Sequence, residues 1–77
     1  MSTVTLIQAI VDYLNRQKAL GKKQVFRTAV YAVIEDRHGS SAIGNGRTIT
    51  RGVMNQAAQM VGGTYLPSKN GNSKVIF

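Results

Sequence analysis

The sequence has 77 residues, with ten Lys and Arg residues against three acidic ones, no cysteine and one histidine, for a formal net charge of +7. A chain of this length forms one domain, spanning 1–77, with a modest core. The lack of cysteine excludes disulfides and thiolate metal sites, and so few histidines and carboxylates leave little apparatus for catalysis, so we expect a non-enzymatic domain without metals or cofactors.

The first predicted element is an amphipathic helix over 3–20. Leu6, Ile10 and Leu14 fall on one arc when residues are plotted at about 100° each, and polar residues occupy the opposite arc. Gly21 directly after this stretch suits a helix C-terminus. The helix is therefore expected to bury one face.

The second predicted element is a helix over 24–37. This stretch is rich in β-branched and aromatic residues, which by propensity alone would allow a strand. The adjacent apolar residues Val25 and Phe26 break the alternation that a strand needs, and the apolar positions gather on one helical face, with Arg27 on the polar side. Gly39 can adopt the left-handed conformation that ends a helix.

A glycine-rich connection over 39–47 leads to the third predicted helix, which begins after Thr48 or Thr50 and ends at Val61. Either threonine can cap its first turn. The apolar arc is assigned to Ile49, Val53, Ala57, Met60 and Val61.

The opposite face of the third helix carries Arg51, Asn55 and Gln59 at intervals of four residues, with Gln56 beside them. A solvated polar face would show the same spacing, but such faces favour Glu and Lys. Arg, Asn and Gln are instead the side chains that read base edges in DNA. This composition favours a recognition surface.

The C-terminal segment 64–77 contains a hairpin signal. Asn70-Gly71 is the preferred pair for a two-residue type I′ turn. That turn would place Leu66 opposite Val75. Because an isolated two-stranded hairpin is marginal in water, its apolar ends are expected to pack against the helices.

The charge is uneven along the chain. Residues 37–77 hold five basic side chains and no acidic one. A segment of one sign favours a polyanion as partner, whereas a basic face kept for solubility usually carries interspersed acids. No apolar run reaches the roughly 20 residues of a membrane span and the N-terminus lacks a secretory pattern, so we expect a cytoplasmic protein that does not enter a membrane.

Three helices followed by a hairpin with a basic tip resemble a winged helix-turn-helix domain. The resemblance covers nearly the whole chain and depends on element order, length and charge. It implies an α+β fold, a three-helix bundle followed by a C-terminal β-hairpin wing. It also implies a transcriptional regulator or DNA-organising factor that binds double-stranded DNA. The sequence departs from the family because no strand is evident between the first two helices and because the 39–47 link is long.

The resemblance also implies which residues contact DNA. The helix 50–61 would enter the major groove, with base reading by Arg51, Asn55, Gln56 and Gln59. The wing 65–76 would lie on the adjacent backbone or minor groove. Backbone or minor-groove contacts would come from Arg47, Thr48, Thr50, Lys69, Asn70, Asn72 and Lys74.

Two alternatives stay open. The loop Gly44-Asn45-Gly46-Arg47 is similar to the glycine-flanked arginine hooks with which bacterial nucleoid-associated proteins enter the minor groove of A·T-rich DNA. A small interaction module or inhibitor would instead bind an acidic protein surface through the same charges.

Other expectations concern partners and location. RNA is less favoured than duplex DNA, because single-strand binders display stacking aromatics and the basic half of this chain has few. Small free-standing domains often dimerise, so a homodimer is a candidate assembly. The sequence does not locate a dimer surface, and the N-terminal helix is only a guess. In a bacterium, or in a virus of bacteria, the protein would be nucleoid-associated.

Overall fold

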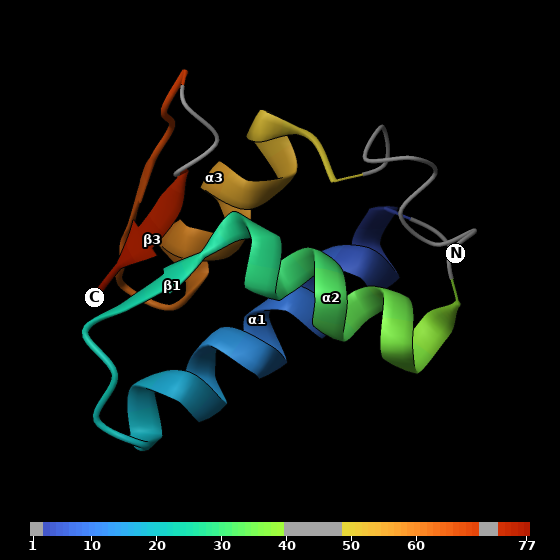
Figure 1. Ribbon diagram of the computed structural model, residues 1–77, viewed down its shortest axis with the longest axis horizontal. Helices are drawn as coiled ribbons and strands as arrows, with labels where there is room; N and C mark the ends of the chain where they lie inside the picture. The colour runs from blue at the N-terminus through green and yellow to red at the C-terminus, as the bar shows by residue number, and fades with distance from the viewer. Residues whose placement is uncertain (1–2, 40–48, 70–72) are drawn as a thin grey trace.

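The computed structural model describes residues 3–39, 49–69 and 73–77. Within these ranges the elements follow the order α1 (Thr3–Ala19), β1 (Gln24–Phe26), α2 (Arg27–His38), α3 (Arg51–Met60), β2 (Thr64–Leu66) and β3 (Lys74–Ile76) (Figure 1). The fold is α+β, with three helices and a small antiparallel sheet, as predicted at that level. No helix in the described ranges has the length and apolar character needed to cross a membrane.

Helix α1 forms the centre of the core and confirms the first predicted helix. Its residues Leu6, Ile10 and Leu14 are fully buried, and the helix packs against both α2 and α3. It ends at Ala19, and the chain then turns at Gly21, whose φ is +85°. The apolar arc read from the sequence is therefore the face that organises the other helices.

The predicted helix over 24–37 is wrong at its beginning. Residues Gln24–Phe26 form strand β1, in which Val25 is buried and its two neighbours are exposed. The segment is extended because β3 offers a free edge: Val25 pairs with Val75, and the amide of Arg27 donates to the carbonyl of Ser73 at 2.8 Å. The strand that was not evident from the sequence is therefore present between the first two helices.

The C-terminus of α2 and the N-terminus of α3 agree with the predicted caps. Gly39, with φ of +85°, follows α2 and donates its amide to the carbonyl of Glu35 at 2.8 Å. The Thr50 hydroxyl accepts the amide of Val53 at 3.2 Å and so caps α3. Of the 39–47 link only Gly39 lies within the described residues.

The apolar arc predicted for α3 is wrong at one position. Met60 is 52% exposed, whereas Met54 and Ala58, which were left out of the arc, are fully buried. The buried face is built from adjacent pairs, Val53 with Met54 and Ala57 with Ala58, and α3 packs against both α1 and β2. Met60 in the last turn lies outside this buried face.

The sheet has the order β1-β3-β2, so the C-terminal strand lies in the middle. The predicted register of the hairpin is wrong by one residue. The prediction paired Leu66 with Val75, whereas Tyr65 is the residue that pairs with Val75. Side chains alternate between the two faces of a strand, so this register puts Val25, Val75 and Tyr65 together on the buried face and leaves Leu66 exposed. The predicted turn at 70–71 lies outside the described residues.

Candidate nucleic-acid interface

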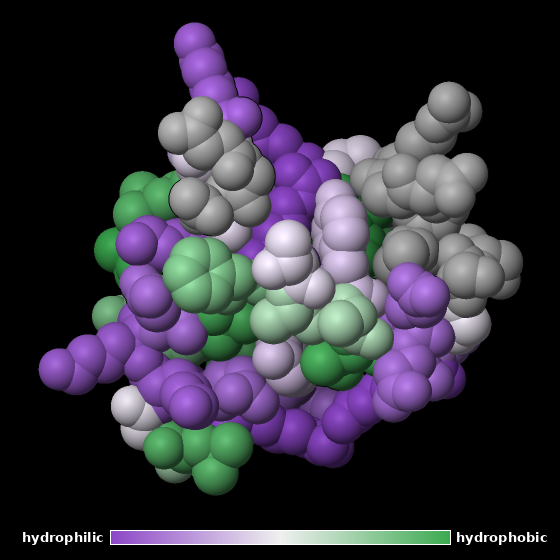
Figure 2. Space-filling model, viewed as in Figure 1, coloured by the Kyte–Doolittle hydropathy of each residue, from purple (hydrophilic) through white to green (hydrophobic). Residues whose placement is uncertain are grey.

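A groove runs between the beginning of α3 and the end of strand β2. Its cavity has a volume of about 350 Å³ and is lined by Arg27, Arg51, Tyr65, Pro67, Ser68, Lys69 and Ser73. Two further hollows share lining residues with it and extend it toward Thr28 on α2 and toward Asn55 on α3. We call this surface the basic groove. Figure 2 shows that hydrophilic residues cover much of this face of the molecule, at its top and also along its left, lower and right edges.

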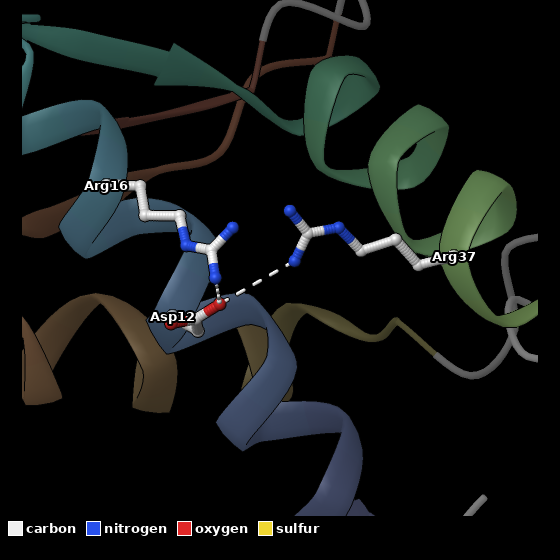
Figure 3. Close-up of polar contacts among 3 residues, drawn as sticks. All are labelled: Asp12, Arg16 and Arg37. Carbon is white, nitrogen blue, oxygen red and sulfur yellow. Dashed lines mark ion pairs between the residues drawn. The ribbon is translucent and has the colours of Figure 1, made fainter.

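The basic groove brings together three cations from distant parts of the sequence, Arg27, Arg51 and Lys69. No carboxylate of the described residues pairs with any of them. The ion pairs among the described residues lie elsewhere: Asp12 on α1 pairs with Arg16 on the same helix and with Arg37 on α2 (Figure 3). The groove therefore keeps uncompensated positive charge, which attracts anions.

Arg27 links the two sides of the groove. Its Nη2 donates to the carbonyl of Ile49 at 2.5 Å, just before α3, and its Nη1 donates to the hydroxyl of Tyr65 at 3.3 Å, on β2. Its guanidinium also lies 5.1 Å from the centroid of the Tyr31 ring, and the Tyr31 hydroxyl donates to the same Ile49 carbonyl at 3.2 Å. These acceptors are neutral. Arg27 is therefore held in place, and none of the ion pairs among the described residues balances its positive charge.

Sequence reasoning missed this role of Arg27, which it assigned to the solvent face of a longer helix. The side chain is in fact partly buried, and its Nε is buried without a hydrogen-bond partner among the described residues. The one available signal was the four-residue spacing to Tyr31, which allows an arginine to lie over an aromatic ring once both are in a helix. The contacts to Ile49 and Tyr65 depend on tertiary structure.

The predicted base-reading residues Arg51, Asn55, Gln56 and Gln59 are all exposed on α3. The structure brings Arg51 and Asn55 to the basic groove, beside the hairpin. Gln56 and Gln59 lie on the open face of the helix, outside the groove lining. The four residues therefore form an exposed polar surface that begins at the groove and continues along α3.

The predicted backbone-contact residues do not stay together. Lys69 lines the basic groove, and the Thr50 hydroxyl is engaged as the α3 cap. Lys74 pairs with Phe26 and Leu66 in the sheet, and alternation with buried Val75 places it on the outer sheet face, away from the groove lining. Outside the described residues lie Arg47, Thr48, Asn70, Asn72 and the remaining hook residues Gly44, Asn45 and Gly46.

Comparison of this chain with protein-family models, curated proteins and solved structures finds no match. The function is therefore inferred from the geometry and charge of the basic groove and of the exposed face of α3.

Proposed function

We propose that this chain is a DNA-binding protein of the winged-helix type, a transcriptional regulator or DNA-organising factor of the cytoplasm. It inserts α3 into the major groove and rests the 65–76 hairpin on the adjacent backbone or minor groove. The observation that carries the proposal is the basic groove, in which Arg27, Arg51 and Lys69 meet without a carboxylate partner among the described residues. Phosphate oxygens are the ligands that such a set of donors binds best.

The neighbouring face of α3 favours duplex DNA over an isolated phosphate. Arg51 and Asn55 stand at the groove edge and Gln59 follows one turn later, all exposed. An α-helix fits the major groove, where arginine can bind guanine and asparagine or glutamine can bind adenine with two hydrogen bonds each. Cations beside the helix would then hold the backbone while its exposed face reads the bases.

The arrangement of the elements also supports the winged-helix interpretation. Strand β1 lies between α1 and α2, which removes one of the two departures from the family noted in the sequence. The β2–β3 hairpin follows α3 directly, and Tyr65 on β2 is joined to Arg27 at the start of α2. The wing and the helices therefore frame one groove.

A salt titration of duplex binding tests the proposal. Fluorescence anisotropy of a labelled random duplex should give log affinity falling with log salt at a slope of about −2 if Arg27 and Lys69 neutralise two phosphates. Lys69→Ala should reduce the slope by about 1, whereas Arg51→Ala should mainly lower the preference for one sequence over another. Lys22→Ala is the matched control, because Lys22 is exposed but lies outside the groove lining.

Three outcomes would contradict the proposal. The first is the absence of duplex binding below about 100 µM at moderate salt, the weak end of non-specific affinity. The second is a Lys22→Ala variant that weakens binding as much as Lys69→Ala. The third is tighter binding to single-stranded RNA than to duplex, which would identify RNA as the ligand.

A further inference from the structure

A second hollow is lined by residues of α1 and α2, which pack against one another, and by Leu20 just after α1; the ribbons of both helices are shown in Figure 1. Its volume is about 660 Å³, and its apolar lining includes Tyr13, Leu20 and Val33. Leu20 is 72% exposed, and Tyr13 and Val33 are partly exposed. We call this surface the α1–α2 hollow.

The charged border of the α1–α2 hollow contains both signs. Arg16 and Arg37 lie on it and share the Asp12 carboxylate, at 3.2 Å and 3.6 Å (Figure 3). Asp36 also borders the hollow, is exposed and forms no ion pair within the described residues. The acidic residues of the chain all lie on α1 and α2, so this is the part of the surface where charge is balanced.

We propose that the α1–α2 hollow binds the same hollow of a second copy of this chain, forming a homodimer with two-fold symmetry. Two copies of a chain with net charge +7 repel one another through their basic surfaces. In a contact with two-fold symmetry each interaction forms two times, once in each direction. Asp36 of each copy can therefore form an ion pair with Arg16 of the other. Leu20 and Val33 supply apolar area to be buried at the centre.

A second copy of the chain fits the α1–α2 hollow better than a nucleic acid does, and better than a protein whose surface carries charge of a single sign. A nucleic acid would be repelled by the exposed carboxylate of Asp36, and a strongly acidic or basic protein would match only half of the border. A second copy matches both halves, because it presents the same two signs in reversed order. The inference goes beyond the proposed function and does not require that the basic groove bind DNA.

Sedimentation equilibrium without DNA tests the contact. The wild-type chain should approach twice its mass of 8.3 kDa as concentration rises, and Leu20→Glu should weaken dimerisation by about tenfold or more. Val4→Glu is the matched control. Val4 is an apolar residue near the beginning of α1 and is 70% exposed, as Leu20 is 72% exposed, but it does not line the hollow. Circular dichroism would verify that both variants are folded. A wild-type chain that stays monomeric at about 1 mM, or equal weakening by both variants, would overturn the proposal.

A charge exchange tests the pairing itself. Asp36→Arg and Arg16→Glu should each be monomeric, because each places like charges opposite one another twice. An equimolar mixture of the two folded variants should form a heterodimer, since both contacts then join opposite charges. A mixture that remains monomeric would overturn the proposed contact. Because no DNA is present, these results are separate from success or failure of duplex binding.

Discussion

The Nη1 of Arg27 donates to the hydroxyl of Tyr65 at 3.3 Å and so connects the beginning of α2 to strand β2 across 38 positions of sequence. The same guanidinium holds the carbonyl of Ile49 at the entrance to α3. These two acceptors lie on opposite sides of the basic groove. One side chain therefore sets the distance between the helix and the hairpin that flank it.

Arg27→Lys should lower the free energy of unfolding by about 1–3 kcal/mol, because a lysine keeps the charge but cannot reach both acceptors in the geometry of the guanidinium fork. Tyr65→Phe removes only one acceptor and should cost about 0.5–1.5 kcal/mol. Urea denaturation followed by circular dichroism measures both. Equal stability of Arg27→Lys and wild type would show that the link does not hold the groove together.

Lys69 and Lys74 should differ in their effect on duplex binding, although the sequence assigned both to the DNA backbone. Lys69 lines the basic groove, whereas Lys74 lies on the outer face of the sheet. Lys69→Ala should weaken binding to all sequences and reduce the salt slope by about 1, and Lys74→Ala should leave the slope unchanged. The comparison is made by anisotropy over a range of salt concentrations. A larger effect of Lys74→Ala would place the DNA on the sheet.

Asn55→Ala should reduce sequence preference, at a cost of about 1–3 kcal/mol for the preferred duplex if a two-hydrogen-bond contact to adenine is lost. Affinity for random duplex should change little. The preferred sequence is first selected from a random pool with the wild-type protein. Asn15→Ala provides the control, because Asn15 is an exposed asparagine on α1. Unchanged preference in Asn55→Ala would remove this residue from the reading surface.

The two methionines of α3 should respond differently to truncation. Met54 is fully buried, so Met54→Ala should lower the free energy of unfolding by about 2–5 kcal/mol. Met60 is 52% exposed, so Met60→Ala should change it by no more than about 0.5 kcal/mol. Urea unfolding curves of the two variants provide the measurement. Similar losses would mean that α3 is rotated about its axis.

Gly63 should resist substitution more than Gly52. A Cβ at Gly63 would lie 2.6 Å from the carbonyl oxygen of Ile76, so Gly63→Ala must displace β3 and should cost more than about 1 kcal/mol. A Cβ at Gly52 would meet nothing closer than 3.8 Å, and Gly52→Ala should stabilise α3 by about 0.5–1 kcal/mol. Thermal unfolding would rank the two variants, and a stable Gly63→Ala would show that the strand can shift freely.

Periodicity predicted the parts of the fold that depend on local pattern. Helix α1 and the caps at Gly39 and Thr50 follow from residue type and spacing, and all three are observed. Strand β1 could not be read in the same way. Its three residues are extended because they form hydrogen bonds with the edge of β3. In this pairing Val25 lies opposite Val75, which is 50 positions later in the sequence.

The candidate site was predictable only in part for the same reason. Arg51 and Asn55 were identified because they lie on one exposed face of a helix, which spacing reveals. Arg27 was missed because its partners come from two other segments, and the outward position of Lys74 depends on a register that is one residue away from the predicted one. Local pattern identifies faces of helices but does not determine which faces meet.

Among the described residues, the α1–α2 hollow shares no lining residue with the basic groove. A dimer formed through the hollow, as proposed above, would therefore leave the groove of each copy uncovered. If the groove binds duplex as proposed, each copy would keep its own contact with DNA, and the affinity of the pair would depend on whether both contacts can form on one molecule.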